Sequence, residues 1–200
     1  MHNFTSIGGQ RRYRAFMLTL WATRASVNAW RYVPLERMCY SINAPGYLTD
    51  VDFTWDGSFF VFTATGGPPM AYSHIGTSIC DAAARFNTLV TAPTRPVWIN
   101  YTGGDTLTSV AVTGPAVYVQ GHQRWLNNPY GHNSAGPGAV SRPGIGAIHP
   151  VTGLALAWNP GKEGGIGGKD LYATTAGLWV GSDTNFIHGE FHPSLALMPF

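Results

Sequence analysis

A pattern of about sixty residues recurs along this chain of 200 residues, and it constrains the fold more than any other feature. Residues 48–53 (LTDVDF) return as 107–112 (LTSVAV), 59 positions later. Each is followed by a turn and a second apolar segment that ends in glycine, at 59–67 and 116–121, and a third copy spans 169–181. The closing glycines, with an earlier one near the start, are Gly9, Gly67, Gly121 and Gly181, spaced 58, 54 and 60 residues apart. A repeat of this length predicts similar structural units packed in series.

Within each unit, apolar residues alternate with polar ones, which is typical of half-buried strands. Val51, Phe53 and Trp55 fall on one face of such a strand, and glycine-containing turns link the first strand of each unit to the second. A third strand is expected at 15–20, 82–86, 145–148 and 195–197, and a fourth strand, with a tryptophan, around 27–30, 97–99 and 154–158. The sequence therefore predicts an all-β chain of four-stranded antiparallel units, with a β-propeller segment favoured and a β-sandwich as the alternative.

The repeat predicts a single β-propeller segment over residues 1–200. Its divisions are a partial blade at 1–33, blades at 47–101 and 105–160, and a partial blade at 169–200. About three and a half blades are fewer than ring closure needs. We therefore expect an incomplete ring, cut from a larger propeller, whose uncovered end blades favour self-association.

Residues 4–18 (FTSIGGQRRYRAFML) resemble the delta-sixty type propeller repeat, whose pattern is F-x-x-[IV]-G-G-x-x-R-x-R-x-A-x-L. The final unit, 177–184 followed by 195–197, is similar to the closing repeat of secreted actinobacterial proteins that carry such repeats. The middle units depart from the pattern, because neither Arg124-Trp125 nor Ala84-Arg85 reproduces the double arginine. The resemblance implies an extracellular β-propeller of mostly unassigned activity. The parent protein would be secreted, although the first residues of this chain do not read as a signal peptide.

The composition of the chain indicates which classes of partner are not expected. Charged residues make up only 11% and the net charge is +2, so no extended cationic surface is expected and nucleic acid is not a predicted partner. No apolar run is long enough to predict insertion into a membrane. Cys39 and Cys80, the two cysteines, predict a disulfide, with two separate buried thiols as the alternative. We expect no cofactor and no metal, because segments 188–192 and 161–170 fail the zinc-protease, phosphate-loop and dinucleotide motifs.

The long connections between second and third strands offer the candidate binding surface. The predicted ligand contacts on these loops are aromatic, amide, imidazole and acidic side chains: Tyr72, His74, Trp125, Asn128, Tyr130, His132, Asp183 and His188. Such a surface suits a carbohydrate, an extended polymer or a protein. The alternative interpretation is that the rings pack the loops against the fold and that the amides cap turns.

The favoured function is a non-enzymatic extracellular β-propeller module, structural or ligand-binding. The alternative is a propeller-type enzyme that acts on glycans, with catalytic groups partly in blades outside this chain. Glycoside hydrolysis needs a matched pair of carboxyls, and the ten acidic residues suggest no such pair. Asp50, Asp52 and Asp56 are interpreted as the polar face of a strand and its turn. Two carboxyls converging at the centre in an open cleft would favour the enzyme.

Overall fold

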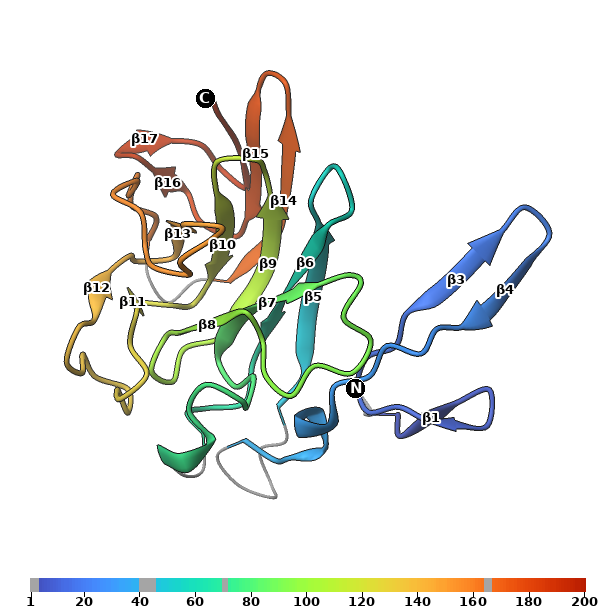
Figure 1. Cartoon of the computed structure of the whole chain (residues 1–200). Helices are drawn as coiled ribbons and strands as arrows, with labels where there is room; N and C mark the ends of the chain where they lie inside the picture. Colours follow the sequence, from blue (N-terminus) through green and yellow to red (C-terminus); the bar gives the residue numbers. More distant parts are fainter. Residues whose placement is uncertain (1–3, 40–45, 70–71, 164–166) are drawn as a thin grey trace.

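The computed structural model describes residues 4–39, 46–69, 72–163 and 167–200 (Figure 1). In these residues the chain consists of antiparallel sheets and two short 3-10 helices, η1 (Val33–Glu36) and η2 (Tyr72–His74). The predicted all-β class is therefore confirmed. Within the same residues, no helix has the length and apolar character needed to span a membrane.

Three sheets make up most of the fold. Sheet I has the order β5-β6-β7-β8, formed by β5 (Leu48–Phe53), β6 (Phe59–Ala64), β7 (Ala82–Asn87) and β8 (Trp98–Tyr101). Sheet II has the order β9-β10-β13, formed by β9 (Leu107–Val112), β10 (Val117–Gly121) and β13 (Ile145–Ile148). Sheet III has the order β14-β15-β18, formed by β14 (Gly168–Thr174), β15 (Gly177–Ser182) and β18 (Leu195–Met198). In Figure 1 the tight turns that join β5 to β6, β9 to β10 and β14 to β15 lie at the top.

The strands expected in these three sheets are mostly present. The third strands predicted at 82–86, 145–148 and 195–197 coincide with β7, β13 and β18, and the fourth strand predicted at 97–99 overlaps β8. The fourth strand predicted at 154–158 is reduced to one bridge, between Ile148 and Ala155. Trp158 is half-buried and packs with its ring edge-on to Tyr118, at a centroid distance of 5.1 Å.

The N-terminal segment differs from the partial blade expected at 1–33. It forms two separate hairpins, β1 (Ser6–Ile7) with β2 (Gln10–Arg11) and β3 (Leu18–Trp21) with β4 (Arg24–Val27). The expected second strand does not pair with the third, because Gly8 and Gly9 adopt positive φ and turn the chain back on itself. In Figure 1 the β3–β4 hairpin projects away from sheet I.

The first strands of the three sheets, β5, β9 and β14, lie side by side in that order (Figure 1). Asp50 Oδ2 accepts a hydrogen bond from the Val110 amide at 2.8 Å, and Asp52 Oδ2 accepts one from the Val112 amide at 2.7 Å. Gln120 Nε2 donates to the carbonyl oxygens of Asp170 and Gly181, at 2.6 and 3.0 Å. Side chains of one sheet thus satisfy backbone groups of the next, where no strand pairing is available.

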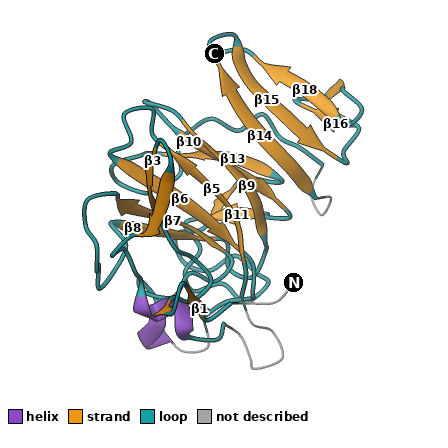
Figure 2. Ribbon diagram, turned by 90° about the vertical axis from the view of Figure 1, so that its right-hand side faces the viewer, coloured by secondary structure: helices purple, strands orange, loops and turns teal. Residues whose placement is uncertain are grey.

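Apolar side chains fill the spaces between these elements. Phe59 and Val61 of sheet I pack with Val117 and Val119 of sheet II, while Tyr118 of sheet II packs against sheet III. Residues 15–35 form a further cluster with sheet I, centred on Trp30, which is 1% exposed. Figure 2 places sheet III at one end of the molecule and the two 3-10 helices at the other.

Cys39 and Cys80 form a disulfide, which confirms the pairing predicted from the sequence. The bond joins the end of the N-terminal segment to the residue pair that precedes β7, across a sequence separation of 41 residues. It therefore holds the segment against sheet I, next to the cluster around Trp30.

Candidate functional site

The loop between β10 and β13 carries half of the predicted ligand contacts and folds around its own short hairpin. β11 (Trp125–Leu126) pairs with β12 (Val140–Ser141), an element that the sequence did not reveal because two-residue strands carry no alternation. Asp105, from the connection between sheets I and II, holds the guanidinium of Arg124 through two hydrogen bonds of 3.0 and 2.8 Å. The entrance of the loop is therefore fixed to the connection between sheets I and II.

Trp125 lies on this hairpin as a half-buried ring. The guanidinium carbon of Arg124 sits over it, 4.4 Å from the ring centroid. Because Asp105 orients the guanidinium, the stack of carboxylate, cation and ring is held in one arrangement. A ring supported in this way can offer its outer surface to an apolar or sugar face at a small cost in side-chain entropy.

Asn128, another predicted contact, is fully buried. Its amide nitrogen donates to the carbonyl oxygens of Thr102 and Ser134, both at 2.9 Å, and its amide oxygen accepts from the Gly136 amide at 2.8 Å. These contacts organise the loop from inside, as in the alternative interpretation in which amides cap turns. Asn128 therefore has no exposed surface for a ligand in this structure.

The remaining predicted contacts are spread over three loops. Tyr130 and His132 are exposed on the same loop as Trp125, whereas Asp183 and His188 are exposed on the loop between β15 and β18. Tyr72 and His74 belong to η2, and the side chain of Tyr72 lies outside the described residues. The carbonyl oxygen of His74 accepts from the Thr77 and Ser78 amides, so this residue closes a turn.

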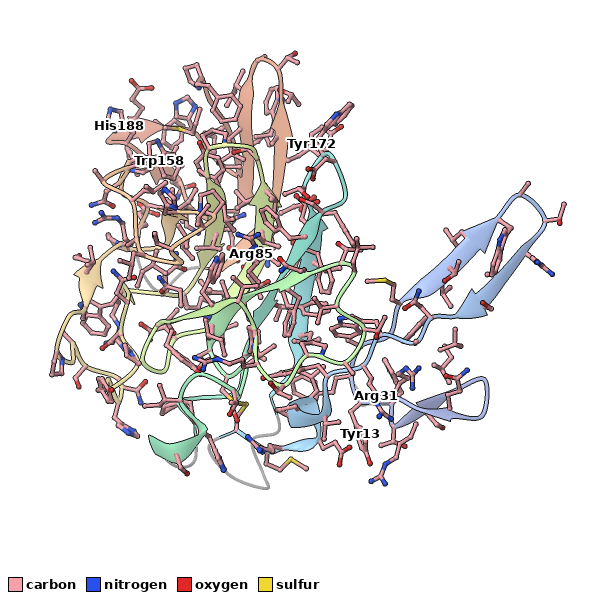
Figure 3. The ribbon with its side chains drawn as sticks, viewed as in Figure 1. Tyr13, Arg31, Arg85, Trp158, Tyr172 and His188 are labelled. Carbon is pink, nitrogen blue, oxygen red and sulfur yellow. A yellow bond between two sulfur atoms is a disulfide. The ribbon has the colours of Figure 1, made fainter. Side chains whose placement is uncertain are left out.

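The loop between β15 and β18 has a pocket of its own. It contains the short hairpin of β16 (Phe186–Ile187) and β17 (Glu190–Phe191), also unforeseen. His188 and Trp158 lie on the same side of the molecule in Figure 3, and both line a cavity of about 540 Å³. Asp183 is outside this cavity's lining and pairs with Lys169, with an Oδ2–Nζ distance of 3.3 Å. Of the two predicted ligand contacts on this loop, Asp183 and His188, only His188 lines the pocket.

Sequence reasoning missed a second hollow, where β5, β9 and β14 meet. This cleft, of about 310 Å³, is lined by acidic, aromatic and aliphatic side chains, among them Asp50, Asp52, Asp170, Trp55 and Tyr172. Trp55 is fully exposed, and Figure 3 draws Tyr172 extending outward from β14. The equivalence of Asp50 and Asp170 in the repeat was the available signal, but the side-by-side arrangement of the strands was needed to use it.

The carboxylates of this cleft are held by backbone amides. Besides its bond to Val110, Asp50 accepts from the Val51 amide at 2.7 Å, and Asp52 likewise accepts from the Phe53 amide at 2.8 Å. Desolvation raises the pKa of Asp50, the two backbone hydrogen bonds oppose that shift, and the charges of Asp170 and Asp52 add to it. In Asp50 and in Asp52, one carboxylate oxygen therefore accepts from the next amide of β5 and the other accepts from an amide of β9.

A further acidic residue, Asp81, is buried at the junction of sheets I and II. Its Oδ1 accepts from the Thr106 hydroxyl at 3.3 Å, and the amides of Gly66 and Gly67 also donate to its carboxylate. Desolvation nevertheless raises its pKa to about 6. Asp81 lies too deep to meet a ligand, and its contacts mark it as a link between loops. Among the described residues, no group of three or more His, Cys, Asp or Glu side chains is arranged to hold a metal ion.

Comparisons with protein-family models, with curated proteins and with solved structures found no match. The resemblance of residues 4–18 to the delta-sixty repeat thus stays a prediction.

Proposed function

We propose that this chain is a segment of an extracellular β-propeller, about three and a half blades long, that serves as a non-enzymatic structural or ligand-binding module. The observation that carries the proposal is the side-by-side arrangement of β5, β9 and β14. A propeller places the first strand of every blade around a common axis, whereas a sandwich distributes such strands within two packed layers.

The bonds between neighbouring sheets support this interpretation. Asp50 and Asp52 each reach the residue that lies 60 positions ahead, in the first strand of the following sheet. The link from Gln120 to Gly181 spans 61 positions. Contacts at one repeat length are expected when consecutive copies of a unit pack in the same way. The disulfide is compatible with a secreted parent, because disulfides persist in oxidising compartments.

For the ligand, we propose a carbohydrate or another extended polymer that contacts the surface around Trp125. The ring is half-buried, is supported from one side by Arg124 and is accompanied on its loop by the exposed Tyr130. Aromatic rings fixed in this manner suit the weakly polar faces of sugars, because stacking removes both surfaces from water. Asn128 is left out of the contact set because its amide is used inside the loop.

A glycan array tests the ligand. The wild-type chain should bind, Trp125→Ala should lose binding, and Trp21→Ala should retain it. Trp21 is a matched control, because it is an exposed ring under a neighbouring arginine, Arg24, at 4.7 Å, on the projecting β3–β4 hairpin. Equal binding by the Trp125 variant, or no binding by the wild-type chain, would contradict the ligand-binding role and leave only the structural one.

A second candidate, glycan hydrolysis, has one observation in its favour. Three carboxylates line the cleft at the meeting point of the first strands, and the pKa of Asp50 is raised in the direction a general acid needs. Against it, both oxygens of Asp50 and of Asp52 already accept backbone hydrogen bonds. Release of reducing ends from glycan polymers by the wild-type chain, abolished in Asp50→Asn, would favour the enzyme over the module.

A further inference from the structure

Each of the three sheets has an apolar face built from equivalent residues, here called its front face. It is defined by two residues of the first strand: Val51 and Phe53 in sheet I, Val110 and Val112 in sheet II, and Leu171 and Ala173 in sheet III. Their partners on the second strand continue the face, as in the pairs Val110 with Val119 and Leu171 with Val180. The opposite side of each sheet is called its back face.

Two of the three front faces are covered and one is open. Sheet I packs its back face on the front of sheet II, and sheet II packs its back face on the front of sheet III. Val110 is accordingly 2% exposed and Leu171 is 5% exposed, whereas the equivalent Val51 of sheet I is 45% exposed. Trp30 covers Phe60 and Phe62 on the outer half of this face but leaves its inner half uncovered.

The uncovered half of the front of sheet I forms one wall of an apolar groove. Val51 and Phe53 lie on this wall, and Phe16, Leu18 and Leu20 lie on the facing wall, before and within β3. The groove has a volume of about 430 Å³ and is lined by apolar side chains. Apolar surface of this kind on an isolated chain marks a contact site.

At the other end of the series, the back face of sheet III is open. Tyr172 on β14 pairs across the sheet with Trp179 on β15, which pairs with Leu197 on β18, so the three side chains share that face. Trp179 is 38% exposed, whereas Tyr118, which holds the corresponding place on the covered back face of sheet II, is 8% exposed. Likewise, Tyr172 is 67% exposed, whereas its counterpart Ala111 is 1% exposed. Asp170 repeats the position of Asp50 and, like it, accepts from the next amide of its own strand, at 2.9 Å.

We propose that the back face of sheet III binds the front face of sheet I of a second copy of this chain, head to tail, and that two copies close into a ring. The interface would continue the one that the chain forms twice internally, because the two open faces are the unused halves of that repeated contact. The inference rests on the proposed function in treating the three sheets as consecutive propeller units.

The number of copies follows from the number of sheets. Propellers close with about four to eight units. One copy supplies three sheets and the β3–β4 hairpin, which is too few. Two copies supply six sheets and two hairpins, within the range, whereas three copies exceed it. Closure by two copies also uses every open face, so further growth into filaments is not expected.

Light scattering coupled to size exclusion tests the proposal on the whole chain. At concentrations from about 1 to 100 μM we expect a mass of twice 21.6 kDa. Phe53→Glu on the front of sheet I and Tyr172→Glu on the back of sheet III should each weaken dimerisation by about 30-fold or more. Leu89→Glu is the matched control, because Leu89 is 91% exposed in the connection between β7 and β8, outside both faces, and it should remain dimeric.

Mixing the two variants separates this arrangement from other dimers. In a head-to-tail pair formed from one copy of each, one interface joins two unmodified faces, so an equimolar mixture should recover heterodimers that neither variant forms alone. A dimer made by one face against itself would be broken by one substitution, left intact by the other and not restored by mixing. That result, or a wild-type chain that is monomeric throughout, would overturn the proposal.

Circular dichroism keeps these outcomes interpretable. Because Phe53 and Tyr172 are exposed, each variant should show the wild-type spectrum. Each should also retain the disulfide between Cys39 and Cys80. The result is also separable from that of the glycan array. A monomer that binds glycans through Trp125 overturns the dimer and not the module, whereas a dimer that binds no glycan overturns the ligand-binding role and not the dimer.

Discussion

The three sheets and the N-terminal segment share one sequence repeat, yet they bury their strands to different extents. All six residues of β6 are buried, whereas β3 buries none and leaves Leu20 72% exposed. The strand pattern is present in both. The difference lies in what stands beside them, because β6 has strands on both edges and packed layers on both faces, while β3 has only β4. The repeat thus predicts where strands form, and the position in the series decides whether they are covered.

The N-terminal segment itself has two parts, an anchor packed on sheet I and the projecting β3–β4 hairpin. Residues 28–39 are fixed to sheet I by Trp30, Tyr32, Leu35 and the disulfide, while the β3–β4 hairpin extends from this anchor. Substitutions in the anchor should therefore act like substitutions in a sheet, and those in the hairpin should act like substitutions on a surface.

Trp30→Ala should have the largest effect. The ring is 1% exposed and meets Phe60 and Phe86 edge-on, at 5.5 and 5.7 Å, so its loss leaves a large cavity between the segment and sheet I. We expect a loss of about 4 kcal/mol in the free energy of unfolding, measured with chemical denaturant. Trp21→Ala in the hairpin should change it by less than about 0.5 kcal/mol. Similar losses for both would show that the division of the segment is wrong.

Removal of the disulfide by the double substitution Cys39→Ala and Cys80→Ala should cost about 3 kcal/mol. The bond closes a long loop and joins the anchor to β7, so its loss increases the conformational freedom of the unfolded chain. Thermal unfolding of the variant, compared with the oxidised wild-type chain, measures the effect. Unchanged stability would mean that the anchor is held by packing alone.

Asp81 should make stability depend on pH. Its pKa is about 6 in the folded chain and 3.8 when unperturbed, so between these values the folded state binds more protons than the unfolded state. Stability should therefore be highest below pH 4 as far as this group is concerned, and fall by about 3 kcal/mol as the pH rises from 4 through 6. Asp81→Asn should flatten this part of the profile. A steeper decline in the variant would contradict the assignment.

The smallest effect is expected at the links between sheets. Asp52→Ala should cost about 1.5 kcal/mol, because the amide of Val112 in β9 loses its acceptor. Asp183→Ala, which removes an exposed pair with Lys169, should cost less than about 0.5 kcal/mol and serves as the control. Equal values would mean that the carboxylate of Asp52 adds nothing to the contact between sheets I and II.

Several features of the fold could be predicted from the sequence. Alternation and turn chemistry locate β7, β13 and β18, and the count of two cysteines predicts the bond between Cys39 and Cys80. The hairpins β11–β12 and β16–β17 could not be predicted, since two residues give no period. The separation of β1 from β3 was also hidden, because the sequence does not show that Gly8 and Gly9 adopt positive φ and turn the chain into a hairpin of its own.

The candidate site was less predictable than the fold. Loop length directs attention to Trp125, but composition cannot tell an amide that meets a ligand from one that organises a loop, as Asn128 does. The acidic cleft escaped notice because its members come from strands about sixty and one hundred and twenty residues apart, Asp50 and Asp170 among them. Only the lateral order of β5, β9 and β14 brings these residues together.

That lateral order can be measured directly by nuclear magnetic resonance. Nuclear Overhauser contacts should join the amide proton of Val110 to the β-protons of Asp50, and the amide proton of Val112 to those of Asp52. The account predicts both, with slow exchange of the two amide protons despite the edge position of β9. Rapid exchange at Val110 and Val112, with contacts from β5 to some other strand, would contradict it.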